Sequence, residues 1–477
     1  MEQIDTVEPI SNCSDLYKDT HWMQYPPHLT NVYSYFESRG SVNRDGFFDE
    51  TIFFGLQMYL KKYLVGRVIT QDILDNESEF LNLCFGFDYF NREGFQKIVD
   101  DHDGNLPIEI RAVPEGTRVP NHNVLMTVVN TDPDLPFVTN YVETILSNVW
   151  YPITVATLSY NCRQLIDRYA KTVGERASII HLNDFGLRGC TCPEQGGIGG
   201  CAHLAVFSGT DNKMGIRYAQ RYYGATGSIG LSANAAEHST VTAYGRENEA
   251  VAYKTIIENT PNEAVVSIVS DSYDIYNAVE NIFGDSLREY ILSRDGKVVI
   301  RPDSGDPAEV SLNLMRILYA KFGGTINDAG YMLLNPKIGL IYGDGISYDS
   351  IDRILDNVVN KGGFAPSNLI FGMGASLVQR MDRDTFKFAF KCSAAKIAND
   401  WYSIYKDPVT DNNKRSKRGK LKLIRDNTGC YKTVQIDPTE YEHAYKLEDH
   451  LVPVFRDGKL LKDYSFAEIR ERINTHF

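Results

Sequence analysis

The chain has 477 residues and a mass of 53.9 kDa, more than one hydrophobic core usually organises, so two packed domains or a large barrel with an added domain are expected. Hydrophobic residues make up 43% and charged residues 23%, as in a folded globular protein, and the formal net charge of −13 disfavours a general nucleic-acid binder. The sequence shows neither an apolar run of about 18 residues nor a basic and apolar leader, so we expect a cytoplasmic protein with no membrane partner.

The two ends of the chain both contain short extended segments. Within residues 1–145, the stretch "LPIEIRAVPEGTRVPNHNVLMTVVNTDP" holds two or three such segments interrupted by Pro and Gly, which is typical of an antiparallel sheet. Residues 384–477, which include "DWYSIYKDPVTDNNKRSKRGKLKLI", also indicate strands and turns. We expect both parts to pack together as one mixed α/β domain outside the catalytic one.

Residues 146–383 alternate between short β-branched runs and helical patterns. Runs such as "SIIHLNDFG" and "KVVIRPDSGDP" end abruptly in polar residues or glycine, and segments such as "SLNLMRILYAKF" carry apolar residues at helical spacing. This alternation predicts a parallel sheet. With at least six such units, the sheet is long enough to close, so the expected fold class is α/β with an irregular (β/α) barrel.

The ends of the expected barrel strands carry carboxylates, arginines and glycines. Because active sites of such barrels lie where the carboxyl ends of the strands meet the loops, these residues are candidates for one shared site. They are Asp184, Phe185, Arg188, Asp211, Asp271, Arg301, Asp303, Gly343, Asp344, Gly372 and Gly374.

Two glycine loops and one acid–arginine pair favour a phosphorylated substrate. "YGDG" and "FGMGAS" follow the last expected strands, where backbone N–H groups can approach a phosphate. Either loop alone is more typical of a plain turn, and it is the pair in successive barrel loops that favours a phosphate site. In "RPDSGDP", Arg301 and Asp303 are two residues apart at a strand end and point to the same side. The carboxylate can hold Mg²⁺ or a ribose hydroxyl, while the arginine can face an anion or a carbonyl.

Three further features have two interpretations each. His238 in "NAAEHSTVTAYG" can exchange a proton or attack phosphorus, or it can be a residue of a helix start or of the core. "CTCPEQGGIGGCAH" places Cys190, Cys192, Cys201 and His203 as four soft ligands for zinc, or forms a loop at the mouth of the site. The basic stretch "KDPVTDNNKRSKRGKLK" is an anion site or a solvated loop.

Motifs along nearly the whole chain resemble the nicotinamide phosphoribosyltransferase family of type II phosphoribosyltransferases. They are, in order, "YKDTHWMQYPP", "NDFGLRG", "GTD", "AAEHST", "SDSYDIYNA", "RPDSG", "GDG", "FKCS" and "KDPVTDNNKRSKRG". The resemblance implies that nicotinamide and 5-phosphoribosyl 1-pyrophosphate are joined to give nicotinamide mononucleotide and pyrophosphate. It also implies Mg²⁺, stimulation by ATP through a phosphorylated histidine, and a homodimer with shared active sites.

The resemblance assigns a role to each candidate residue. The nicotinamide ring would stack between Phe185 and the Tyr17 of the other subunit, with Asp211 accepting from the carboxamide NH₂ group and Arg301 donating to its oxygen. His238 would be phosphorylated with Asp271 as its hydrogen-bond partner, and Asp303 and Asp271 would face magnesium directly or through water. The phosphoribose would meet Arg188, Ser232, Gly343, Asp344, Gly374 and Ala375, and pyrophosphate or ATP would meet Arg39, Arg383, Lys391, Lys406 and Lys414.

Some positions depart from the family pattern, and three alternatives compete with this interpretation. Asn183 and Asn234 replace histidine and proline, and Met373, Ala375 and Ser376 replace parts of a more glycine-rich loop. An enzyme for nicotinate is the nearest alternative, but Asp211 would repel a carboxylate substrate. A non-catalytic homologue has no physical need to keep His238, Asp271, Arg301 and Asp303, and the long ordered motifs argue against an unrelated phosphate-binding barrel.

Overall fold

The computed structural model describes residues 8–41, 48–410, 415–442, 444–475 and 477. The chain forms two compact units: the first takes its residues from 1–157, 222–224 and 382–476, and the second consists of 158–221, 225–381 and 477. The helix α6 (Trp150–Thr172) has residues in both units. The domain limits expected from the sequence, 1–145, 146–383 and 384–477, stay a prediction. No helix in the described ranges is long and apolar enough to cross a membrane.

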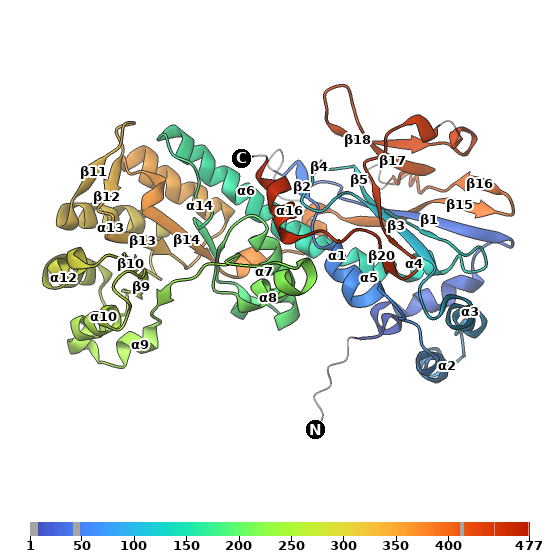
Figure 1. Ribbon diagram of the computed structural model, residues 1–477, viewed down its shortest axis with the longest axis horizontal. Helices are drawn as coiled ribbons and strands as arrows, with labels where there is room; N and C mark the ends of the chain where they lie inside the picture. Colours follow the sequence, from blue (N-terminus) through green and yellow to red (C-terminus); the bar gives the residue numbers. More distant parts are fainter. Residues whose placement is uncertain (1–7, 42–47, 411–414, 443, 476) are drawn as a thin grey trace. The chain divides into compact units, whose positions relative to one another are not determined.

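The first unit is built on a seven-stranded antiparallel sheet with the order β16-β15-β1-β5-β3-β19-β20. Its strands come from both ends of the chain, as expected: β1 lies between β15 and β5, although β15 is far away in the sequence (Figure 1). The last six residues of β1 are all buried, so the strand is covered on both faces. The strands are β1 (Leu29–Glu37), β3 (Ile108–Ala112), β5 (Val124–Asn130), β15 (Ala389–Ile397), β16 (Asp400–Ser403), β19 (Val452–Arg456) and β20 (Lys459–Leu460).

Short helices and two small sheets complete the first unit. Asn91 begins α3 by accepting a hydrogen bond from the N–H of Gly94, and Gly86 ends α2 at φ 74°, a left-handed conformation that glycine adopts without strain. The small sheets pair β2 (Glu50–Ile52) with β4 (Arg118–Pro120), and β17 (Lys420–Arg425) with β18 (Tyr431–Ile436). The helices are α1 (Leu56–Tyr59), α2 (Gln71–Phe85), α3 (Arg92–His102), α4 (Val138–Tyr141), α5 (Glu143–Ser147) and α16 (Phe466–Asn474).

The second unit is the expected irregular (β/α) barrel. Its seven strands are parallel and have the order β7-β6-β14-β13-β10-β9-β8, and a bridge between Gly209 and Leu231 links β7 to the segment before β8. The central strands β9 and β13 are buried along their whole length, because helices cover parallel sheets. They are β6 (Leu182–Asp184), β7 (Gly209–Thr210), β8 (Asn234–Ala235), β9 (Val266–Val269), β10 (Val298–Arg301), β13 (Ile338–Tyr342) and β14 (Leu369–Met373).

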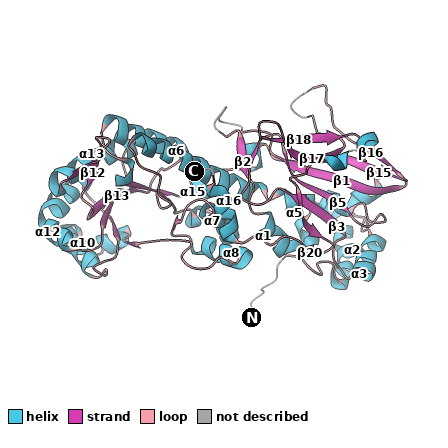
Figure 2. Cartoon of the chain, turned by 45° about the horizontal axis from the view of Figure 1, so that its top comes forward, coloured by secondary structure: helices cyan, strands magenta, loops and turns pink. Residues whose placement is uncertain are grey.

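Helices follow the barrel strands: α13 lies beside β13 (Figure 2), and α10 packs against β9. Asp306 begins α13 by accepting from two backbone N–H groups, with Pro307 in the first turn, and Ser347 begins α14 through a capping box. The barrel unit also contains the hairpin β11 (Gly324–Ile326) and β12 (Met332–Leu334). Its helices are α7 (Pro193–Leu204), α8 (Lys213–Tyr223), α9 (His238–Thr242), α10 (Glu249–Glu258), α11 (Ile275–Asn277), α12 (Arg288–Ser293), α13 (Pro307–Phe322), α14 (Tyr348–Leu355) and α15 (Ala375–Val378).

Candidate active site

His238 and Asp271 face each other at the strand ends of the barrel. His238 begins α9, and its Nε2 lies 3.1 Å from Oδ1 of Asp271, so the hydrogen bond expected from the sequence is present. The other oxygen of Asp271 accepts from the backbone N–H of Asp303 at 3.1 Å and from the hydroxyl of Ser304 at 2.6 Å. A carboxylate only accepts hydrogen bonds, so Nε2 carries the proton and Nδ1 keeps its lone pair.

Asp303 follows β10 and lies close to three other charged residues. Burial raises its pKa first, the Arg301 guanidinium lowers it, and the Asp271 and Asp344 carboxylates raise it again. In the described part of the chain, no group of three or more His, Cys, Asp or Glu is arranged to hold a metal ion. Mg²⁺ commonly binds through one or two carboxylates, water and substrate phosphates, so Asp303 and Asp271 fit a magnesium ion that arrives with a polyphosphate.

Phe185 follows β6 and lies against a floor of glycine backbone. Its N–H donates to the carbonyl of Met373 at 3.0 Å. A Cβ atom on Gly372 would lie 2.1 Å from the Phe185 ring, and one on Gly343 would lie 3.4 Å from it. Gly372, which the sequence placed only at a strand end, therefore makes room for the aromatic ring.

Asp211 follows β7 and is exposed, with its backbone N–H donating to the carbonyl of Asp184 at 3.0 Å. Its Oδ1 accepts from the hydroxyl of Ser232 at 2.5 Å, so Ser232, expected at the phosphoribose, bonds to the carboxylate expected at the carboxamide. Arg301 donates from Nη2 to the carbonyl of Ala236 at 2.9 Å. Its Nε is buried and has no hydrogen-bond partner among the described residues, which leaves one donor for a ligand.

The loop of Arg188, which follows β6, lies against the glycine loop "FGMGAS" after β14. Arg188 is exposed on the short helical turn Leu187–Gly189, and a Cβ on the adjoining Gly189 would lie 3.2 Å from that of Ala375. Gly374 precedes α15, and a Cβ built on it would meet nothing within 4 Å. Backbone open to this side and a nearby guanidinium suit a phosphate.

Basic residues in the first unit form a second cluster. Lys391 on β15 is partly buried, and its pKa is lowered mainly by burial and further by the charges of Arg39, Arg383 and Lys18. The structure thus brings together three of the residues predicted to bind pyrophosphate or ATP. Lys406, also predicted, is exposed and donates from its backbone to the Ser416 hydroxyl at 2.8 Å, whereas Lys414 lies outside the described residues.

Sequence reasoning missed the carboxylate that pairs with Arg39 of this cluster. Glu37 is buried on β1, accepts from Nε of Arg39 at 2.7 Å and pairs with Nζ of Lys417. The Nη2 of Arg39 is buried and has no hydrogen-bond partner in the described part of the chain. Glu37 and Arg39 are two residues apart, a spacing that puts strand side chains on one face, and this could have indicated the pair.

Tyr17 lies in the first unit, on the 3₁₀ helix Leu16–Met23. The residue is 57% exposed, its ring packs edge-to-face with the His21 ring at 4.8 Å between centroids, and the Nζ of Lys18 lies 5.5 Å from its own ring centroid. An exposed aromatic ring has a face free for stacking.

The zinc interpretation of the Cys190–His203 stretch is wrong. Both ring nitrogens of His203 are engaged, with Nδ1 3.0 Å from the Ser159 hydroxyl and Nε2 3.2 Å from the carbonyl of Gly209. Cys201 is fully buried in α7, while Cys192 is exposed before that helix. A helix separates the cysteines, so they do not converge on one point.

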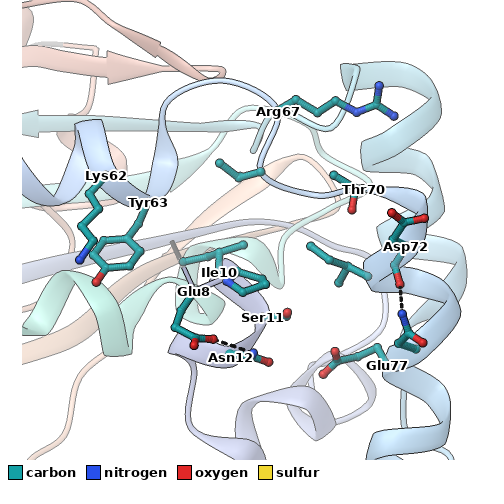
Figure 3. A pocket seen from close by; sticks show the side chains of 14 residues that line it. Glu8, Ile10, Ser11, Asn12, Lys62, Tyr63, Arg67, Thr70, Asp72 and Glu77 are labelled. Carbon is teal, nitrogen blue, oxygen red and sulfur yellow. Dashed lines mark hydrogen bonds between the residues drawn. The ribbon is translucent and has the colours of Figure 1, made fainter. Parts of the chain in front are cut away.

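A pocket of about 550 Å³ in the first unit lies between residues 8–12, the segment 62–70 and the start of α2 (Figure 3). Charged side chains of both signs line it, among them Lys62, Arg67 and Glu77. None of the site residues predicted from the sequence is among its described lining residues.

Comparisons with known proteins agree on one family. The chain matches the nicotinate phosphoribosyltransferase (NAPRTase) family over residues 180–449 and the nicotinamide phosphoribosyltransferase N-terminal domain over residues 10–110. It is 43% identical to a nicotinamide phosphoribosyltransferase of Xanthomonas campestris pv. campestris (strain 8004) over 462 residues, 96% of each chain. It is 33% identical to one of Acinetobacter baylyi over 499 aligned residues, covering 97% of this chain and 96% of that one.

Solved structures share the fold. Nicotinate-nucleotide pyrophosphorylase from Pyrococcus furiosus superposes with a TM-score of 0.63 at 14% identity, covering 100% of this chain and 98% of that one. Human nicotinic acid phosphoribosyltransferase gives a TM-score of 0.55 at 14% identity, covering 97% and 93%. At this identity the likeness concerns the fold alone.

Proposed function

The chain belongs to the nicotinate phosphoribosyltransferase family, and we propose that it is a member that uses the amide: it transfers the 5-phosphoribosyl group from 5-phosphoribosyl 1-pyrophosphate to nicotinamide. The products are nicotinamide mononucleotide and pyrophosphate. Phosphoribosylation of nicotinamide or nicotinate is a step of NAD salvage, and full-length similarity to named nicotinamide enzymes supports the choice of the amide.

The observation that carries this choice is the position of the Asp211 carboxylate. Asp211 is exposed, and its backbone N–H donates to the carbonyl of Asp184, the residue directly before Phe185. A carboxylate accepts a hydrogen bond from the NH₂ group of a carboxamide and repels the carboxylate of nicotinate. Arg301, with one unpartnered buried donor, suits the carbonyl oxygen of the same group.

Transfer requires the pyridine nitrogen to attack C1 of the ribose as pyrophosphate leaves. The transition state has oxocarbenium character, so the enzyme gains most by holding a planar nucleophile in line and by binding the charged leaving group. Phe185 on its glycine floor fixes the ring plane on one side. We place Tyr17 of the partner subunit of a homodimer on the other side, and the cluster of Arg39, Arg383 and Lys391 at the phosphates.

ATP stimulation is assigned to His238. The Asp271 carboxylate holds the imidazole in the tautomer whose Nδ1 can attack the γ-phosphorus of ATP, with release of ADP, and it stabilises the positive charge that develops. Magnesium would be held by Asp303 and Asp271 together with substrate phosphates, and it would neutralise charge on the pyrophosphate.

The test is incubation of the protein with 5-phosphoribosyl 1-pyrophosphate, Mg²⁺ and either nicotinamide or nicotinate, with and without ATP, followed by mass analysis of the product. We expect nicotinamide mononucleotide, formed faster with ATP. Formation of nicotinate mononucleotide at a higher kcat/KM would overturn the choice of the amide. Absence of both products would favour the non-catalytic homologue.

A further inference from the structure

Asp184, the last residue of β6, is a fully buried carboxylate to which the proposed reaction assigns no role. Its Oδ1 accepts from the N–H of Gly186 at 2.7 Å, and its Oδ2 accepts from Nδ2 of Asn212 at 2.9 Å. Burial, offset in part by the hydrogen bonds from Gly186 and Asn212 and assisted by the nearby Asp211 carboxylate, raises the pKa of Asp184 to about 6, so at neutral pH it is mainly the ionised form that accepts both bonds. Phe185 lies between the two residues bonded to each other, Asp184 and Gly186.

Asn212 is 1% exposed and joins three segments of the barrel. Besides donating to Asp184, its Nδ2 donates to the carbonyl of Gly196 in α7 at 2.8 Å, and its Oδ1 accepts from the N–H of Gly215 in α8 at 3.1 Å. The Asn212 amide packs tightly against α7: a Cβ atom on Gly200 of that helix would lie 2.4 Å from Nδ2 of Asn212. Both N–H donors and the oxygen of this amide are therefore engaged, which fixes the backbone next to Asp211.

We propose that Asp184 and Asn212 are positioning residues for the pyridine substrate, acting through Phe185 and Asp211. Asp184 holds the loop of Phe185 through Gly186 and the loop of Asp211 through Asn212, and its own carbonyl accepts from the N–H of Asp211. One buried carboxylate thus sets the distance between the ring-stacking side chain and the group that reads the carboxamide. This inference rests on the proposed pyridine site but not on which pyridine is preferred.

The test compares Asn212→Ala with Asn368→Ala, a matched control. Asn368 is also a buried amide in the barrel and also makes three hydrogen bonds, but it lies just before β14, at the opposite end of a strand. For both variants, kcat and KM are measured for the pyridine that the wild type prefers and for 5-phosphoribosyl 1-pyrophosphate. Thermal unfolding is recorded beside them.

For Asn212→Ala we expect KM for the pyridine to rise about tenfold and the ratio of kcat/KM between the two pyridines to narrow by a similar factor, with KM for the phosphoribosyl donor unchanged. Asn368→Ala should lower the unfolding temperature without moving that ratio. Asp184→Asn keeps the shape of the side chain but places its NH₂ group against the NH₂ group of Asn212. It should shift the ratio of kcat/KM in the same direction, and it replaces Asn212→Ala as the test if the alanine variant does not fold.

An unchanged pyridine KM and ratio in both Asn212→Ala and Asp184→Asn would overturn the inference, as would equal changes for both substrates. The proposed function fails separately. If the wild type used only nicotinate, the preference assigned to Asp211 would be wrong, while the pyridine KM of the variants would still test Asp184 and Asn212.

Discussion

Replacing Asp271 by asparagine tests the proposed phosphohistidine through the tautomer of His238. Asparagine has one accepting oxygen and one donating NH₂ group in place of two accepting oxygens. If its oxygen stays with the N–H of Asp303 and the hydroxyl of Ser304, the NH₂ group faces Nε2 of His238. The imidazole then accepts at Nε2 and carries its proton on Nδ1, where no lone pair is left to attack ATP.

The size of the expected decrease in histidine phosphorylation follows from the second orientation of the asparagine side chain, the one that still supports attack by Nδ1. If the asparagine side chain turns its oxygen toward His238, its NH₂ group opposes the N–H of Asp303, and a buried donor loses its partner. Such a loss costs about 1–3 kcal/mol, so the productive orientation is populated about 5- to 150-fold less. We expect the rate of histidine phosphorylation to fall by a factor in this range, whereas basal transfer, for which Asp303 and the substrate phosphates still hold magnesium, falls less.

The assay follows phosphate from ATP carrying radioactive phosphorus at the γ position as acid-labile, base-stable label on the protein over time. His238→Ala sets the background and should lose both the label and the stimulation by ATP. Asp274→Asn is the matched control, since Asp274 is exposed, caps α11 through the N–H groups of Tyr276 and Asn277, and keeps that function as asparagine. Labelling of Asp271→Asn at the wild-type rate, or of His238→Ala above background, would refute the reasoning.

Three other outcomes are expected. Asp211→Asn should narrow or reverse the preference for nicotinamide by about tenfold or more, because it removes both an acceptor and a repulsive charge, and an unchanged ratio of kcat/KM for the two pyridines contradicts the assignment. Mixing inactive Tyr17→Ala and Phe185→Ala proteins should restore activity, since each heterodimer has one intact site; no recovery despite subunit exchange counts against shared sites. Glu37→Gln should lower the free energy of unfolding, measured by denaturant titration, by about 3 kcal/mol, because Glu37 forms buried ion pairs. Glu50→Gln, at a partly exposed ion pair, should lower it by less than about 1 kcal/mol, and equal losses for the two variants would contradict a buried ion pair at Glu37.

The barrel could be predicted because its strands are buried on both faces. Runs such as Val298–Arg301 are apolar until the strand leaves the core, so the change to polar residues marks both the strand end and the site. The strand β8 gave no such signal: it has only two residues, both exposed, and it pairs with β9, about 30 residues further along the chain. The position of such a short strand, at the end of the strand order, is determined by its pairing with the neighbouring strand rather than by its own sequence.

The site was harder to predict than the barrel, because hydrophobic periodicity indicates which side chains are buried but not which residues they bond to. The hydrogen bond between His238 and Asp271 joins residues 33 positions apart and was expected only from family resemblance. Asn212 follows the recognisable Asp211, but its role depends on hydrogen bonds to three other segments. The two interpretations of His203 stayed open for the same reason: its sequence neighbours are cysteines, whereas its spatial neighbours are a hydroxyl and a carbonyl.

The glycine floor beneath Phe185 limits how this protein could escape a planar inhibitor that stacks on that ring. Any side chain at position 372 would start 2.1 Å from the ring and displace it, so the substrate would lose its stacking surface together with the inhibitor. Resistance would instead arise at exposed groups such as Asp211, to which we assign the choice of amide over acid. Escape from such a compound and loss of substrate selectivity are therefore coupled.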